Sequence, residues 1–193
     1  MSNEPAVKTK VELDPRYIFR LTGVLLAICA VVSLLLAVVN SATEPIITAM
    51  QAEKTAKAMA QVLQADEYVP VAVSAPGVTG VSEAKSGGNT VGHVVEVTAN
   101  GFGGAINMVV GVDTDGAVTG VSVIKHTETG NIGTKVVGDS AVLGRFEGMS
   151  LAKGEITVNS GENRFDGVTG ATVSSKGVTA GVNAALAAVA QLG

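Results

Sequence analysis

The 193-residue sequence has little cysteine, few aromatic residues and few charged residues. Its single cysteine, Cys29, excludes a scaffold held together by disulfides within the chain. Only 16% of the residues are charged while 47% are hydrophobic, a composition that excludes a disordered chain. The net charge is −4, with no Trp, two Tyr and four Phe. These values argue against a nucleic-acid-binding protein, which needs a basic surface and stacking rings.

What the sequence does contain is one long apolar run, over residues 21–43, that carries no charge. A helix rises about 1.5 Å per residue, so roughly 20 residues cross a hydrocarbon layer of about 30 Å. A cleaved signal peptide is the alternative. The apolar region of a signal peptide is shorter than this run, however, and no Ala-x-Ala cleavage site follows the run. We therefore expect a tail over 1–20, a transmembrane helix over 21–43 and a separate domain over 44–193.

Basic residues near the run predict its orientation. Four of them precede it, whereas two follow within the next twenty residues: Lys8, Lys10, Arg16 and Arg20, then Lys54 and Lys57. Because Lys and Arg gather on the cytoplasmic side, we expect a cytoplasmic tail and a main domain outside the cytoplasmic membrane. Residues 177–193 are also uncharged, but they are short and include polar side chains, which favours a buried helix over a second span.

After the run, the pattern is a helix, several strands and a final helix. Apolar spacing predicts helices over 45–63 and 175–192. Runs of β-branched residues predict strands over 69–73, 91–99, 106–112 and 118–124. Residues 113–116, Asp-Thr-Asp-Gly, form a turn sequence between the last two strands. A calcium site is the alternative, but the rest of an EF-hand loop is missing.

The stretch 125–163 is polar and glycine-rich and shows few clear elements. Because the strands follow one another without intervening helices, the order predicts an α+β domain with an antiparallel sheet and flanking helices.

Catalytic and metal-binding groups are few. The sequence has two histidines, His93 and His126, and its one cysteine lies in the apolar run, so a mononuclear site of His and Cys ligands cannot be assembled. A phosphate-binding loop, a Rossmann glycine pattern and a nucleophile–base set are also absent from the sequence. We expect no catalytic residues, no metal and no turnover by the chain alone.

The segment 166–178 is the most informative. It brings the hydroxyls of Thr172, Ser174 and Ser175 to the start of the last predicted helix, with the positive charge of Lys176 nearby. A helix N-terminus attracts phosphate through its free N–H groups and its dipole. The simpler interpretation, and from the residues alone the commoner one, is that one of these hydroxyls caps the helix.

Residues 166–172 read D-G-V-T-G-A-T. They match D-G-x-[S/T]-G-A-T, the flavin-attachment motif of the FMN-binding domain family that includes the G subunit of Rnf complexes and the C subunit of the sodium-pumping NADH:quinone oxidoreductase. The sequence therefore resembles this family. Residues 101–106, G-F-G-G-A-I, resemble the family's G-[YF]-G-G-P-I with Ala105 in place of proline, and residues 126–133 resemble H-x-E-T-P-G-L-G without its proline.

The resemblance implies that Thr172 accepts FMN through a phosphoester, made by a flavin transferase that uses FAD. It implies an electron-transfer subunit that works with other membrane subunits of an ion-translocating ferredoxin:NAD oxidoreductase. The chain length favours the Rnf G subunit over the quinone-reductase subunit. Two alternatives remain: the quinone-reductase subunit, and an anchored, non-redox assembly or binding module. The remaining residues expected near the cofactor are Asp166, Gly167, Thr169, Gly170, Ala171, Ser174, Ser175, Lys176, Glu128 and Thr129.

The shortage of aromatic residues limits how FMN is held. After the apolar run only Tyr68, Phe102, Phe146 and Phe165 remain, too few for an aromatic sandwich around a flavin ring. Phe102 and Phe165 lie within or beside the family-like segments. We expect a partly exposed ring that rests mainly on aliphatic and backbone groups, with a covalent tether in place of tight non-covalent binding.

Overall fold

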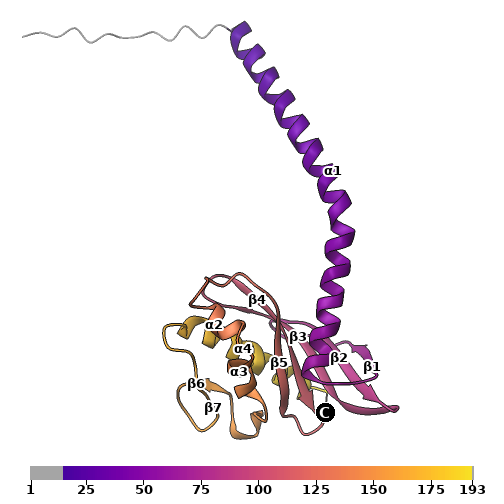
Figure 1. Cartoon of the computed structure of the whole chain (residues 1–193), viewed down its shortest axis with the longest axis vertical. Helices are drawn as coiled ribbons and strands as arrows, with labels where there is room; N and C mark the ends of the chain where they lie inside the picture. Colours follow the sequence, from indigo (N-terminus) through magenta and orange to yellow (C-terminus); the bar gives the residue numbers. More distant parts are fainter. Residues whose placement is uncertain (1–14, 193) are drawn as a thin grey trace, which may run out of the picture. The chain divides into compact units, whose positions relative to one another are not determined.

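The computed structural model describes residues 15–192. The chain divides into an N-terminal unit that ends at Met50 and a C-terminal unit that begins at Gln51. Helix α1 (Pro15–Val62) runs through both, so the helices expected over 21–43 and 45–63 are one continuous helix (Figure 1). Pro45 lies inside it, where the proline removes one helical hydrogen bond. The expected tail lies largely outside the described residues, and its last six residues are helical.

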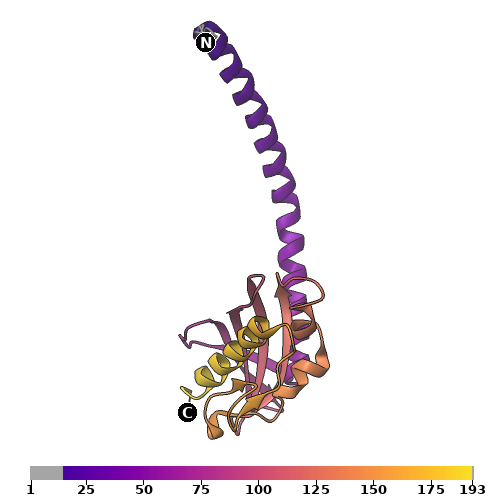
Figure 2. The same ribbon diagram turned by 90° about the vertical axis from the view of Figure 1, so that its left-hand side faces the viewer.

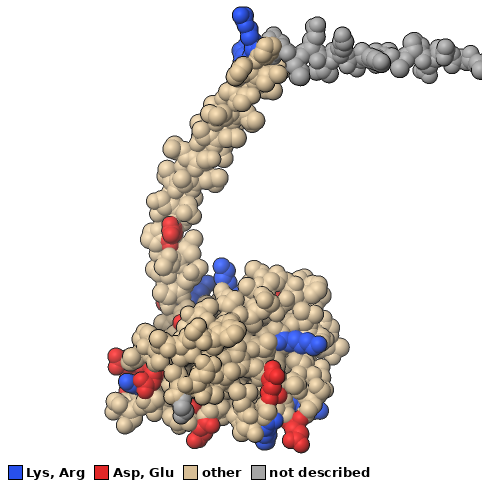
Figure 3. All heavy atoms as spheres, turned by 180° about the vertical axis from the view of Figure 1, so that it is seen from behind, with Lys and Arg blue, Asp and Glu red and all other residues tan. Residues whose placement is uncertain are grey.

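The N-terminal unit is a helix with an apolar surface. All of residues 15–50 are exposed, including large side chains such as Leu26, Leu34 and Leu36. Figure 3 shows a long stretch of α1 without Lys, Arg, Asp or Glu side chains. In the described chain α1 is the one helix long and apolar enough to cross a membrane, and it is compatible with a single-pass membrane anchor.

The C-terminal unit is built on a five-stranded antiparallel sheet, with strands in the order of the sequence. The strands are β1 (Glu67–Val71), β2 (Val78–Ser86), β3 (Asn89–Asn100), β4 (Ala105–Asp113) and β5 (Val118–His126). The strands expected over 91–99, 106–112 and 118–124 are confirmed as β3, β4 and β5. The first strand begins and ends two residues earlier than expected, and β2 was not predicted.

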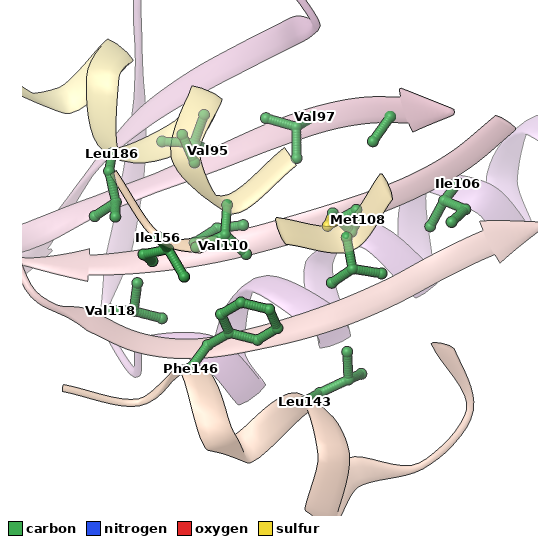
Figure 4. Packing of buried hydrophobic residues seen from close by; sticks show 14 of the residues in the cluster. Val95, Val97, Ile106, Met108, Val110, Val118, Leu143, Phe146, Ile156 and Leu186 are labelled. Atoms are coloured by element: carbon green, nitrogen blue, oxygen red, sulfur yellow. The ribbon is translucent and has the colours of Figure 1, made fainter. Parts of the chain in front are cut away.

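Helices cover both faces of the sheet, which confirms the expected α+β domain. Helix α4 (Thr172–Val189) packs Val178 and Val182 on the face that carries Val95 and Val97. Val94 points to the opposite face, because successive side chains of a strand alternate. Figure 2 shows α4, in yellow, lying across the strands, and Figure 4 shows the apolar side chains packed between them.

The last turn of α1 packs on the other face of the sheet. Ala58 and Val62 form a second apolar cluster with Val94. Thr119 Oγ1 donates a hydrogen bond to the Val62 carbonyl at 2.6 Å. Gly120 leaves room for this approach, since a Cβ there would lie 3.2 Å from Val62 Cα. The end of α1 is therefore an integral part of the C-terminal unit.

The β4–β5 connection is the expected hairpin turn. Asp113 Oδ1 accepts hydrogen bonds from the backbone N–H groups of Asp115 and Ala117, at 2.9 and 2.8 Å. Gly116 follows with φ +76°, a value that favours glycine. Across residues 15–192, no group of three His, Cys, Asp or Glu side chains is placed to hold a metal ion.

Between β5 and α4 the chain forms only short elements, in line with the few expected there. They are α2 (Thr134–Val137), α3 (Ser140–Leu143), η1 (Gly144–Phe146), η2 (Leu151–Lys153), β6 (Thr157–Val158) and β7 (Arg164–Phe165). Phe146 and Phe165 hold this region to the core: both are fully buried, and their rings stack with centroids 4.0 Å apart. Figure 4 shows Phe146 beside the strands.

Candidate cofactor site

Helix α4 lies very close to the connection between β3 and β4. A Cβ at Gly177 would be 2.5 Å from the carbonyl oxygen of Asn100 and 3.2 Å from the Cα of Gly101. Only glycine permits this approach without a shift of the backbone. The close contact brings the first turn of α4 beside the Gly101–Gly104 segment, so two of the family-like segments meet.

The loop that leads into α4 is fixed by hydrogen bonds. The backbone N–H of Gly167 donates to Asn159 Oδ1 at 2.9 Å, and that of Val168 donates to Ser175 Oγ at 3.2 Å. A Cβ at Gly167 would lie 2.8 Å from Val158 Cγ1, and Gly170 has φ +83°. The two glycines of the motif are therefore required by a close approach and by a left-handed turn.

Asp166 begins this loop and lies outside the cavity lining. Its Oδ1 pairs with Arg164 Nε at 2.9 Å, and its carbonyl oxygen accepts a hydrogen bond from Arg145 at 2.8 Å. The Asp166 side chain is 63% exposed. A surface ion pair of this kind contributes little stability, and the bond from Arg145 is the contact that joins the start of the loop to η1.

Helix α4 begins at Thr172, three residues before the predicted start. Ala171 precedes the helix, and no side chain caps it. The hydroxyls expected as caps are used elsewhere: Ser174 Oγ donates to Glu128 Oε2 at 2.7 Å, and Ser175 Oγ accepts from Val168. The helix-cap interpretation is therefore wrong, because contacts with other loops draw both serines inward and Thr172 stays exposed.

An apolar cavity of about 250 Å³ lies beside Thr172. Its largest lining side chains, Phe102, Ile132 and Val173, are 69%, 48% and 51% exposed. Ligand pockets usually measure about 300–1,000 Å³ and enclose most of the ligand, so this smaller cavity suits a flat apolar group that is only partly enclosed. The full lining is Phe102, Ile132, Gly170, Ala171, Thr172, Val173 and Ser174.

The structure brings some of the predicted site residues to this cavity and leaves others in its surroundings. Four of them line it: Thr172, Ser174, Gly170 and Ala171. Glu128 is buried behind Ser174. Six stand back from the lining: Thr129, Thr169 and Lys176 are exposed, Asp166 and Gly167 shape the loop, and Ser175 is buried.

Two apolar residues of the cavity, Ile132 and Val173, were missed by sequence reasoning. Ile132 lies inside the segment 126–133 and Val173 directly follows the motif 166–172, and an apolar side chain among polar and glycine neighbours was the available signal. Phe165 lies beside the motif in the sequence, but it stacks on Phe146 in the core. Phe102 is thus the one aromatic residue of the described chain that lines the cavity.

Two larger cavities lie elsewhere on the C-terminal unit. One, of about 430 Å³, includes His93, Asp113 and Leu186, and the other, of about 440 Å³, includes Gln61 and Glu147. Neither contains a residue of the segment 166–172. The smaller cavity is therefore the candidate site, because it alone of the three contains Thr172 and the start of α4.

Comparison with known proteins matches residues 101–187 to the FMN-binding domain family. The G subunit of the Na⁺-translocating ferredoxin:NAD⁺ oxidoreductase complex of Acetobacterium woodii is 32% identical, over 91% of this chain and 93% of the relative. The G subunit of an ion-translocating oxidoreductase complex of Methanosarcina acetivorans is 32% identical, over 90% and 95%. The crystal structure of Shewanella oneidensis NqrC has a TM-score of 0.47 and 26% identity, over 54% of this chain and 53% of that chain.

Both G-subunit relatives match about nine tenths of this chain, and the family model spans both the Gly101–Gly104 segment and the motif 166–172. The chain belongs to the G-subunit family of ion-translocating oxidoreductase complexes and carries its FMN-binding domain.

Proposed function

We propose that this chain is the electron-transferring G subunit of an Rnf-type ferredoxin:NAD oxidoreductase, with FMN attached to Thr172 through a phosphoester. The observation that carries the proposal is the state of the hydroxyls at the start of α4. Ser174 and Ser175 are buried and hydrogen-bonded, whereas Thr172 is exposed and lines the apolar cavity.

The first turn of α4 suits a phosphate on Thr172. Because no side chain caps this turn, its first N–H groups and the positive end of the helix dipole would be available to a phosphate on Thr172. Lys176 lies one turn further along and adds a positive charge. When a flavin transferase uses FAD, the Thr172 oxygen forms the new bond to phosphorus, the pyrophosphate bond breaks, and AMP leaves.

The cavity supports the placement of the flavin ring. Phe102, Ile132 and Val173 offer apolar contacts and are themselves about half exposed or more, so a ring held against them would stay partly open to solvent. FMN supplies reversible electron transfer when it is bound, and a phosphoester leaves its ring unmodified. The partly open cavity gives a redox partner in the membrane complex access to the ring, and the tether prevents loss of the cofactor.

We further propose that the 21–43 segment of α1 anchors the chain with a cytoplasmic N-terminus and the domain 44–193 outside the cytoplasmic membrane. Arg16 and Arg20 precede this segment, and the stretch between them and Glu44 is uncharged. In a Cys29→Ser background, cysteines introduced at Lys54 and Arg20 test this directly. An impermeant maleimide applied to intact cells should label the first and not the second, and the reverse pattern contradicts the orientation.

Intact-mass spectrometry of the full chain, purified from membranes after co-expression with the flavin transferase, tests the attachment. The wild type should gain the mass of one FMN less one water, and Thr172→Ala should abolish the gain. Thr169→Ala is the matched control, because Thr169 is exposed in the same loop but does not line the cavity. An unmodified wild type would favour the non-redox binding module, and a modified Thr172→Ala variant would exclude Thr172 as the acceptor.

A further inference from the structure

Glu128 is the only carboxylate among residues 15–192 that is buried, with 8% of its surface exposed. Its Oε2 accepts a hydrogen bond from Ser174 Oγ at 2.7 Å, and its Oε1 accepts one from the backbone N–H of Gly103 at 3.3 Å. In the described chain no Lys or Arg forms an ion pair with it. Burial of a charge is costly unless hydrogen bonds compensate for it, so this carboxylate calls for a specific explanation.

Glycines surround the carboxylate and leave room for it. A Cβ at Gly101 would overlap Glu128 Oε1, and a Cβ at Gly133 would overlap Oε2. The side chain is therefore enclosed by the β3–β4 connection on one side and by its own loop on the other. An exposed glutamate would need neither glycine, so the local sequence is fitted to this one side chain.

The segments that meet at Glu128 are those that form the cavity. The β3–β4 connection carries Phe102, the loop after β5 carries Ile132, and the first turn of α4 carries Thr172 and Val173. Glu128 is hydrogen-bonded to the first and third of these segments and belongs to the second. One side chain thus links the three walls of the cavity.

We infer that Glu128 is a positioning residue that fixes the three walls of the cavity in place around Thr172. The inference rests on the proposed function for what the cavity receives, while the link between the walls is a property of the protein without FMN. Truncation of Glu128 leaves the Gly103 N–H and the Ser174 hydroxyl without their partner, so the connection that carries Phe102 separates more readily from α4.

Hydrogen–deuterium exchange on the unloaded full chain in detergent tests the link. Among the 101–104 amides, Glu128→Ala should speed exchange of Gly103 at least about tenfold, because this N–H donates its hydrogen bond to the Glu128 carboxylate. Glu128→Gln should exchange at close to the wild-type rate, because a carboxamide of the same shape can accept from Gly103 and donate to Ser174. Glu162→Ala, at an exposed glutamate in another loop, is the matched control and should leave these amides unchanged.

FMN attachment by the flavin transferase gives the second readout. Glu128→Ala should slow attachment at Thr172 severalfold, and Glu128→Gln should restore it. Ser174→Ala cuts only the link to α4, so attachment should slow while the Gly103 amide stays protected. If circular dichroism shows that Glu128→Ala does not fold, Ser174→Ala still tests whether the hydrogen bond between Glu128 and α4 is needed for attachment.

The inference is overturned if Glu128→Ala exchanges and accepts FMN like the wild type, if Glu128→Gln is as impaired as Glu128→Ala, or if Ser174→Ala attaches FMN at the wild-type rate. A wild type that takes up no FMN would overturn the proposed function instead. Even then, exchange in the unloaded variants would still decide whether Glu128 links the walls.

Discussion

Replacement of Gly177 by alanine tests how α4 is placed against the site. Alanine in a helix interior is usually about 1 kcal/mol more favourable than glycine. Here, however, the new Cβ would lie 2.5 Å from the carbonyl oxygen and 3.1 Å from the carbonyl carbon of Asn100. These are backbone atoms and cannot rotate away, so α4 or the β3–β4 connection must move.

Overpacking of this kind costs about 1–3 kcal/mol, which exceeds the gain in helix propensity over most of that range. We expect Gly177→Ala to lower the free energy of unfolding by about 1 kcal/mol. Gly181→Ala is the matched control, because its Cβ would meet the flexible end of Met108, with the Cε atom at 2.9 Å. The propensity gain is the same at both positions, so their difference isolates the backbone contact.

Urea unfolding of the full chain in mild detergent, followed by circular dichroism, measures both variants. Gly177→Ala should also slow FMN attachment, because the displaced connection carries Phe102, a wall of the cavity. If Gly177→Ala is as stable as Gly181→Ala, or more stable than the wild type, α4 does not lie against Asn100 as described.

Two further changes probe the surroundings of the site and the sheet. Ser175→Ala removes the acceptor of the half-buried Val168 N–H, so it should cost about 0.5–1.5 kcal/mol in the same urea assay; no loss would mean that the loop does not need this bond. The hydrogen bond from Thr90, followed by that from Lys85, lowers the pKa of Glu83 below its ordinary value of 4.5. A carboxylate whose pKa is lowered in the folded state stabilises the fold at pH values above its ordinary pKa. This contribution is lost as the pH falls through the lowered pKa of the folded state. In Glu83→Gln the urea midpoint of unfolding should therefore fall slightly less steeply as the pH is lowered. If the midpoint falls as steeply below pH 4.5 as in the wild type, this assignment is contradicted.

The strands show how far local sequence decides the sheet. Four strands rich in β-branched residues were predicted, because such residues fit a pleated, half-buried surface. Strand β2 was missed, since V-T-G-V-S-E-A-K-S combines a glycine with small and charged residues. It forms because β1 and β3 pair with it on both edges and because Val81 and Ala84 are buried. Pairing partners distant in the sequence, rather than propensity, decide such a strand.

The start of α4 was misplaced for a related reason. Serine is a common helix cap, and local pattern therefore favours a helix that begins near Ser175. The Ser174 hydroxyl instead bonds to Glu128, 46 residues earlier in the chain. The motif itself was found through its resemblance to the family's attachment motif, which is contiguous in the sequence. The cavity was not found from the sequence, because Phe102, Ile132 and Val173 come from three separate segments.

The fold separates four hydroxyl residues that look equivalent in the sequence. Ser174 and Ser175 are buried and bonded, which leaves Thr169 and Thr172 exposed. Thr169 precedes the left-handed turn at Gly170 and lies outside the cavity lining, whereas Thr172 is the first residue of α4 and lines it. A phosphate on Thr172 would meet the uncapped first turn of the helix, and a phosphate on Thr169 would lie before the turn that leads there. This difference makes the Thr169→Ala and Thr172→Ala pair decisive, since the two variants differ in position rather than in chemistry.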